Sequence, residues 1–187
     1  MLAALRQDID RLRAIKSKPF PWFVIESLLF ETGFQAVVLY RLAHWFKVRG
    51  IPVMGPLIGR LSQLLTGVDI APGATIGPGL MISHGQGIVI GQWARIGSGC
   101  TLLQQATLGA TGMARLEKMP QVGDEVFIAA GARLLGGIEV GDGAFIGANV
   151  VVARDVPAGA RVLLARDAVE IRPARPPRPE RPPRAED

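Results

Sequence analysis

The chain has 187 residues, of which 49% are hydrophobic, and its mean hydropathy is +0.29. This length suits one modest domain with attachments, and the single cysteine, Cys100, excludes a disulfide within the chain. No run approaches the roughly eighteen apolar residues of a membrane span, and the amino end lacks the pattern of a secretory signal. We therefore expect a cytoplasmic protein without a membrane partner.

The net charge of +5 at pH 7 is concentrated in one place. Five of the basic residues lie close together near the carboxy terminus: Arg172, Arg175, Arg178, Arg181 and Arg184. The basicity is thus largely a local property of the tail, and we expect no nucleic-acid partner.

Residues 1–68 are predicted to form a helical domain, because they contain few glycines and long stretches of helix-forming residues. Prolines and a glycine interrupt these stretches around residues 18–21 and 50–52. The helices are expected around Leu5–Ile15, Trp22–Phe30, Gln35–Lys47 and Leu57–Leu65.

A six-residue repeat of aliphatic side chains begins at Ile70 and ends at Val152. A period of six fits neither a helix nor a hairpin, and it is typical of a parallel β-helix, in which each aliphatic stacks on its counterpart one coil away. We predict an α+β protein with a left-handed parallel β-helix over residues 69–171. The repeat follows Ile70, Ile76, Ile82 and Ile88, then Ile90, Ile96, Leu102 and Leu108, then Val122, Ile128, Leu134, Val140, Ile146 and Val152. Four coils are expected, at 70–87, 90–107, 122–139 and 140–157.

The tail, residues 172–187, alternates proline with arginine and glutamate and has no large apolar residue. Such a segment cannot offset its ordering entropy by burial, so we expect it to be disordered. A solubilising extension and a docking segment for an acidic or SH3-like surface both fit this composition.

Histidine is the residue type that points to chemistry, because the chain has only two and His84 lies inside the repeat. An imidazole holds a proton near neutral pH and is the usual general base. Asp69 precedes it by fifteen residues, nearly one coil, so the carboxylate is predicted to orient the ring from the adjacent layer. A coil-capping aspartate and a surface histidine without a catalytic role fit the same spacing.

The repeat is interrupted between Leu108 and Val122. The intervening residues, 109–121, must leave the coil as an excursion, and long excursions in compact repeats are often functional. The glycines at 109 and 112 would let backbone amides approach a ligand, or would simply allow the chain to leave the coil.

Several motifs in one order resemble the serine O-acetyltransferases of the left-handed β-helix superfamily. They are Gly33-Phe34-Gln35-Ala36 with Tyr40-Arg41-Leu42-Ala43-His44-Trp45, Asp69-Ile70-x-Pro72-Gly73-Ala74-x-Ile76-Gly77, His84-x-x-Gly87-Ile88-Val89-Ile90-Gly91, and Thr107-Leu108-Gly109-x-Thr111-Gly112. The similarity runs from about residue 30 to about residue 160.

The resemblance implies an acetyl-CoA-dependent O-acetyltransferase that acts on a small-molecule hydroxyl. His84 matches the family's general base and Asp69 the residue that orients it, whereas His44 matches a structural position. Small residues of the family contact the coenzyme at positions matching Ala110, Ala130 and Ala148. The family also implies a homotrimer or a dimer of trimers. No metal is expected, since one histidine in the coils cannot supply three imidazole ligands.

Three positions depart from the family at its substrate-binding site. Ser83 replaces an aspartate, while Lys118 and Met119 replace an arginine–histidine pair. Lys118 keeps a positive charge for a carboxylate, but Ser83 offers no counter-charge for an ammonium and Met119 no useful hydrogen bond. L-serine remains the first candidate acceptor. The alternatives are a sugar or specialised-metabolite hydroxyl, or a non-catalytic β-helix scaffold.

Overall fold

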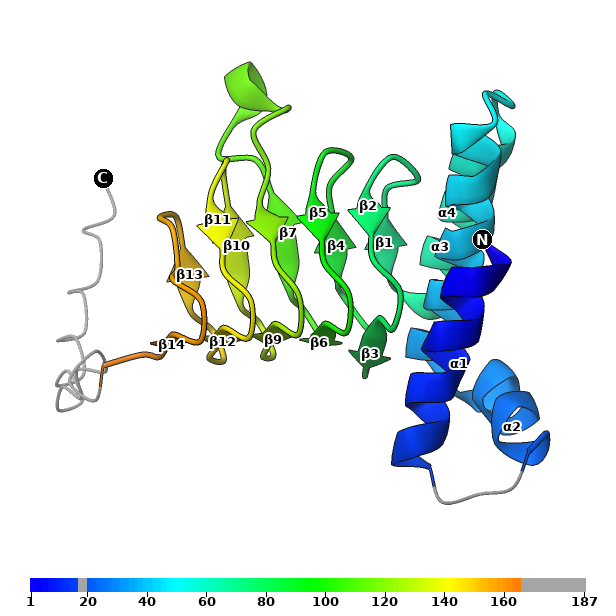
Figure 1. Ribbon diagram of the computed structural model, residues 1–187. Coiled ribbons are helices and arrows are strands. Elements are labelled where there is room, and N and C mark those ends of the chain that lie inside the picture. Colours follow the sequence, from blue (N-terminus) through cyan, green and yellow to red (C-terminus); the bar gives the residue numbers. More distant parts are fainter. Residues whose placement is uncertain (17–19, 166–187) are drawn as a thin grey trace, which may run out of the picture.

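A computed structural model describes residues 1–16 and 20–165 of the chain. Four helices come first and stand together at one end of the molecule (Figure 1). The helix at Trp22–Phe30 matches the prediction at both ends, and each of the other three begins three residues earlier than the sequence predicts. Their bounds are α1 Leu2–Ile15, α2 Trp22–Phe30, α3 Thr32–Val48 and α4 Met54–Thr66. The predicted tail, 172–187, and the end of the predicted β-helix domain lie outside the described residues.

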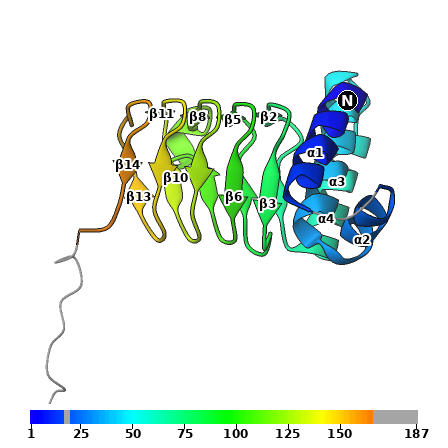
Figure 2. The same ribbon diagram turned by 60° about the horizontal axis from the view of Figure 1, so that its bottom comes forward.

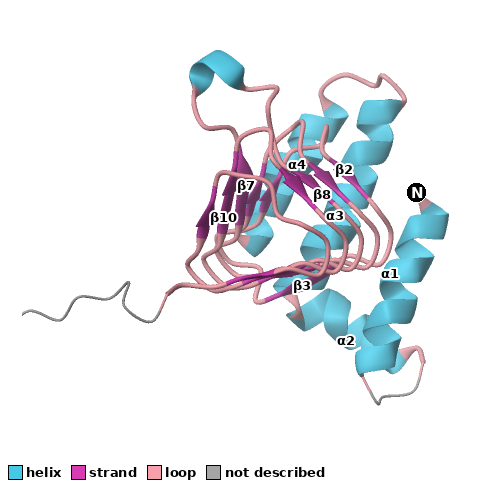
Figure 3. Ribbon diagram, turned by 60° about the vertical axis from the view of Figure 1, so that its left-hand side comes forward, coloured by secondary structure: helices cyan, strands magenta, loops and turns pink. Residues whose placement is uncertain are grey.

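Short strands then form three parallel sheets that enclose a three-sided solenoid (Figure 3). Sheet A contains β1 (Asp69–Ile70), β4 (Val89–Ile90), β7 (Thr107–Gly109), β10 (Arg133–Leu135) and β13 (Val151–Val152). Sheet B contains β2 (Thr75–Ile76), β5 (Arg95–Ile96), β8 (Gln121–Val122) and β11 (Glu139–Val140). Sheet C, seen in Figure 2, contains β3 (Met81–Ser83), β6 (Thr101–Leu103), β9 (Phe127–Ile128), β12 (Phe145–Ile146) and β14 (Arg161–Val162).

The repeated aliphatics form the core of the solenoid, which confirms the predicted fold class. In sheet A the register stacks one buried side chain per strand, and the same pattern holds in the other two sheets except at β14, where Val162 is only half-buried. Full burial of such a side chain contributes about 1.5–3 kcal/mol, so the stacked column stabilises every coil. The column in sheet A is Ile70, Ile90, Leu108, Leu134 and Val152.

The first coil is longer than predicted. Asp69 pairs with Val89, twenty residues on, whereas Val89 pairs with Thr107, eighteen residues on. The two extra residues lie after β3, where residues 84–88 stand opposite only 104–106 of the next coil. Ile88 is therefore a buried residue just before β4, and the aliphatic that follows Ile82 on the strands is Ile90.

A buried ion pair ties the helices to the first coil. Arg41 of α3 donates from Nε to Asp8 Oδ2 of α1 at 2.9 Å and from Nη1 to the Ile76 carbonyl oxygen at 2.6 Å. Asp8 Oδ1 also accepts the backbone N–H of Leu80 at 3.0 Å. The neighbouring Tyr40 hydroxyl donates to the Ala74 carbonyl oxygen at 2.7 Å. These bonds fix α1 and α3 against the strands that lead to His84.

The described helices are too short, or too strongly bent where two join, to match a straight membrane span. Within residues 1–16 and 20–165, no single helix is long and apolar enough to cross a bilayer. The pair α2 and α3 would meet the length and composition together, but these helices are bent by 91° at their junction.

Candidate active site

His84 lies on the bulge that lengthens the first coil, immediately after β3. Its φ is 54°, in the left-handed region that a non-glycine residue rarely occupies, and its side chain is exposed. Strained residues of this kind persist where the surrounding structure holds them, and they cluster at functional sites. The bulge thus turns an imidazole out of the repeat.

Close packing between glycines holds this bulge against the helices. A Cβ on Gly85 would lie 2.6 Å from Val68 Cγ2 and 3.4 Å from Gly33 Cα. A Cβ on Gly33 would lie 2.1 Å from the carbonyl oxygen of Ile82. Only glycine allows α3 and the bulge to approach so closely, and this contact positions His84 relative to the helical domain.

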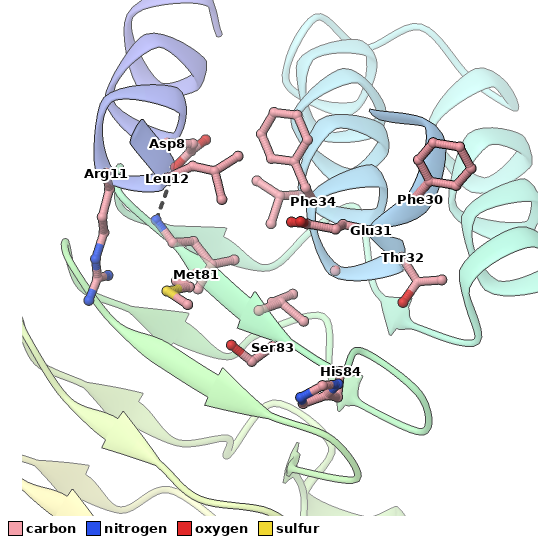
Figure 4. Close-up of a pocket in the computed structure, with 14 residues that line it drawn as sticks. Asp8, Arg11, Leu12, Phe30, Glu31, Thr32, Phe34, Met81, Ser83 and His84 are labelled. Carbon is pink, nitrogen blue, oxygen red and sulfur yellow. Dashed lines mark hydrogen bonds between the residues drawn. The ribbon is translucent and has the colours of Figure 1, made fainter. Parts of the chain in front are cut away.

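A cavity of about 420 Å³ opens beside His84, between the helices and β3 (Figure 4). Residues of α1, residues around the junction of α2 and α3, and all of β3 line it. Its volume lies in the usual range of small-molecule sites. Figure 4 shows Ser83, Thr32 and His84 on one side of this space and Arg11 on the other.

Asp69 lies on β1 at the start of the first coil, His84 lies at the end of that coil, and Asp69 pairs with Val89, which follows the His84 bulge. Among the described residues, however, the structure shows no hydrogen bond between the two side chains. Asp69 Oδ2 instead accepts a long hydrogen bond, 3.4 Å, from Gln63 Nε2 of α4. The predicted orienting contact is not formed in this arrangement, and Gln63 is a partner that the sequence pattern did not identify.

The three predicted acceptor-binding residues lie in different environments. Ser83 ends β3 and lines the cavity with His84. Lys118 lies on the exposed excursion, which contains a short 3-10 helix, η1 (Met113–Arg115), and projects from the coils in Figure 1. Met119 is only 8% exposed, and its sulfur fills the space above Gly91, where a Cβ would lie 2.4 Å away. Met119 therefore packs in the core, and its contact with an acceptor stays a prediction.

Two of the three predicted coenzyme-binding alanines share one corner of the solenoid with His84. Ala130 and Ala148 lie one coil apart between sheets C and A, and the Asn149 N–H donates to the Ala130 carbonyl oxygen at 2.9 Å. The His84 bulge lies at the same corner, in the first coil. Ala110 lies elsewhere, beyond the far end of β7. At the same corner of the second coil, between the His84 bulge and Ala130, the chain carries Gln104 and Gln105.

Two side chains inside the fold, Tyr40 and Cys100, have raised pKa values. Burial raises the pKa of Tyr40 to about 12 and that of the Cys100 thiol to about 11. Cys100 is buried and not activated as a nucleophile. In the part of the chain that the structure describes, no group of three or more His, Cys, Asp or Glu side chains could hold a metal ion.

Comparisons with known proteins agree on one family. A model of the family "Bacterial transferase hexapeptide (six repeats)" matches residues 119–154. Serine acetyltransferase of Synechococcus elongatus is 45% identical over 139 residues, which cover 74% of this chain and 57% of that protein. Serine acetyltransferase of Mycobacterium tuberculosis is 41% identical over 163 residues, which cover 87% of this chain and 70% of that protein.

Solved structures show the same similarity. Serine acetyltransferase of Neisseria gonorrhoeae superposes with a TM-score of 0.79 at 32% identity, over 88% of this chain and 64% of that one. Serine acetyltransferase 1 of Entamoeba histolytica, solved in complex with L-cysteine, gives 0.77 at 34% identity, over 87% and 62%. The chain is thus shorter than these proteins and spans less than two thirds of either.

Proposed function

The chain belongs to the serine acetyltransferase family, and from this premise we propose that it transfers the acetyl group of acetyl-CoA to the hydroxyl of a small molecule. The observation that carries the proposal is the position of His84. Its imidazole makes no hydrogen bond among the described residues and opens onto a cavity of about 420 Å³. A general base needs a free ring nitrogen within reach of a bound hydroxyl, and this arrangement offers one.

In this proposal the reaction is a direct transfer. Acetyl-CoA supplies an activated thioester. His84 accepts the proton of the acceptor hydroxyl as its oxygen bonds to the acetyl carbon, and gives that proton to the sulfur as the carbon–sulfur bond breaks. The imidazole therefore ends the cycle neutral, and holding both substrates beside it supplies much of the rate. We assign Asp69 a positioning role, supported by its place beside Val89, the strand residue that follows the His84 bulge.

We further propose that the coenzyme lies along the corner that contains Ala130 and Ala148. Their methyl groups leave the backbone accessible next to the stacked turns, and the His84 bulge lies at the same corner, two coils before Ala130. Ala110 lies beyond the end of β7, near the start of the excursion, and would contact the coenzyme only from there. Small side chains suit a long ligand that binds along main-chain groups.

We also propose a homotrimer, or a dimer of trimers, located in the cytoplasm. The support for subunit association is the apolar surface of a single chain. Helix α4 exposes Leu57, Leu61 and Leu64, and contiguous exposed apolar side chains usually mark contacts between subunits.

Release of free CoA thiol, measured with acetyl-CoA and an acceptor, tests the activity. L-serine is the reference acceptor, since the relatives are named serine acetyltransferases. The only cysteine of the chain, Cys100, is buried, so the background from protein thiol is low. Acceptor-dependent thiol release that disappears when His84 is replaced supports the proposal. Release that persists without His84 contradicts the assigned base.

A further inference from the structure

The cavity beside His84 indicates which class of hydroxyl compound it accepts. We infer that the preferred acceptor is a neutral alcohol with an apolar body rather than a zwitterionic amino acid. This inference rests on the proposed acetyl transfer at His84 and narrows its acceptor. It follows from how the charged groups of the cavity are already used and from what lines the rest of its wall.

Both carboxylates that line the cavity are already paired. Asp8 binds Arg41 through both oxygens, at 2.9 and 3.0 Å, and also accepts the Leu80 N–H. Its side chain is almost fully buried beside that partner. Glu31 is paired with Lys16. Among the described residues, the cavity therefore has no unpaired carboxylate to hold an ammonium group.

The Arg11 guanidinium, which also lines the cavity, already makes hydrogen bonds within the protein. Arg11 donates from Nη1 to the carbonyl oxygens of Gly79 and Cys100 and from Nη2 to Thr101 Oγ1, at 2.9 Å for the last bond. These bonds tie α1 to the first two coils. A carboxylate that recruited Arg11 would have to break them, and Figure 4 shows Arg11 on the side of the cavity away from His84.

The polar side chains of the cavity that have no hydrogen-bond partner among the described residues lie near His84. Within residues 1–16 and 20–165, the hydroxyls of Ser83 and Thr32 make no hydrogen bond, and both line the cavity with His84. A hydroxyl donates one hydrogen bond and accepts others, so this set suits the neutral oxygens of an alcohol, ester or amide. It offers no countercharge for either end of a zwitterion.

The remaining wall is apolar. Leu12, Phe34 and Met81 come from three elements and face the same space, and Phe30 lies at its rim (Figure 4). An apolar body there would displace water from these side chains, which is favourable in proportion to the area covered. An unpaired ammonium or carboxylate in the same position would lose hydration without compensation.

A series of acceptors that share one hydroxyl tests the inference on the wild-type protein. The probes are L-serine, N-acetyl-L-serine methyl ester and N-acetyl-L-serine benzyl ester. We expect kcat/KM, measured by thiol release, to rise at least about tenfold from serine to the methyl ester and again to the benzyl ester, because each step removes charge or adds apolar surface. Titration calorimetry with the same three compounds measures their binding independently of acetyl transfer.

A charge placed on the wall should abolish this preference. Leu12→Lys introduces an ammonium on the α1 side of the cavity and should lower kcat/KM for the benzyl ester by at least about tenfold. Leu2→Lys makes the same change on the same helix at an exposed position that does not line this cavity, and should leave the acceptor preference unchanged.

The outcomes separate this inference from the proposed function. Esters that react better than serine, with a preference lost in Leu12→Lys, support it. Efficient acetylation of serine with poor use of both esters overturns it and leaves the acetyltransferase intact. Binding of the esters without any thiol release overturns the acetyl transfer instead, and supports the chemistry assigned to the cavity. If Leu12→Lys does not fold, the wild-type series and the calorimetry still decide.

Discussion

Gly33, near the start of α3, lies against the carbonyl oxygen of Ile82 in β3, so close that a Cβ on Gly33 would come within 2.1 Å of that oxygen. Ile82 is followed directly by Ser83 and His84. The helical domain therefore sets the position of the candidate base through one backbone contact, and both partners of this contact line the cavity.

Replacement of Gly33 tests this contact. Gly33→Ala forces α3 away from β3, and overpacking of this kind should lower the free energy of unfolding by about 1–3 kcal/mol. Thiol release should also fall, since His84 shifts with the strand. Urea unfolding and kcat/KM measure the two effects. Gly112→Ala is the matched control for stability, because nothing lies within 4 Å of a Cβ there.

The role of His84 is best tested with asparagine. His84 has a φ of 54°, and asparagine adopts this conformation more readily than alanine does, so His84→Asn removes the base with little backbone strain. Turnover should fall by about two to four orders of magnitude while the circular dichroism spectrum stays unchanged. Turnover near the wild-type rate in a folded variant would rule out His84 as the proton acceptor.

Asp69 should matter less than His84, because its carboxylate is bonded to Gln63 and not to the imidazole. Asp69→Asn should reduce kcat by a smaller factor than His84→Asn and leave KM for acetyl-CoA unchanged, as expected of a residue that acts through another. Asp10→Asn, which changes an exposed carboxylate of α1, provides the control. An Asp69→Asn enzyme as active as the wild type would remove Asp69 from the mechanism.

Tyr40 should make stability depend on alkaline pH. Burial raises its pKa from 10.0 to about 12, so the folded protein favours the neutral phenol more than the unfolded chain does. The resulting stabilisation is complete below pH 10 and is lost as the pH rises toward about 12. Cys100 acts in the same direction, with a pKa raised from 9.0 to about 11.

The measurement for Tyr40 is unusually clean, because it is the only tyrosine in the chain. The ultraviolet absorbance of tyrosinate should appear near pH 12 in the folded protein and near pH 10 in denaturant. Tyr40→Phe should lower stability at neutral pH by about 1 kcal/mol, since the hydrogen bond to the Ala74 carbonyl is lost. Tyrosinate absorbance near pH 10 in the native state would contradict the burial argument.

Light scattering on the purified protein tests the assembly. We expect a mass that is a multiple of three chains, because the exposed leucines of α4 and other apolar surfaces favour contact between subunits. Substituting Leu57 and Leu64 with glutamate should reduce a dimer of trimers to trimers. A stable monomer at micromolar concentration would contradict the proposal.

The repeat could be predicted from the sequence because its cause is local and periodic. Each aliphatic of the repeat stacks on the residue one coil away, so period and residue type alone define strands, turns and core. Three of the four helices follow for a similar reason, since proline and glycine lie at the breaks around residues 18–21 and 50–52, whereas only Glu31 separates α2 from α3. His84 was also identifiable, because a lone histidine interrupts a regular pattern.

The two-residue insertion in the first coil could not be predicted from the period of the repeat. Ile82 and Ile88 keep the six-residue period, although the strand pairing shows that Ile90 is the stacked residue. A period counts residues without revealing which of them pair. Only the register placed the two extra residues at His84 and showed that its backbone leaves the coil.

The cavity and its chemistry were decided by the tertiary structure. Its walls come from residues 8–12, 30–37 and 80–84, which no motif connects. Asp8 and Arg41 neutralise each other across thirty-three residues, and Met119 packs on Gly91 in the core. Periodicity in a sequence specifies contacts between equivalent positions of neighbouring coils. The pairing of charges and the shape of a site depend on how the helical domain packs against the solenoid, and this requires coordinates.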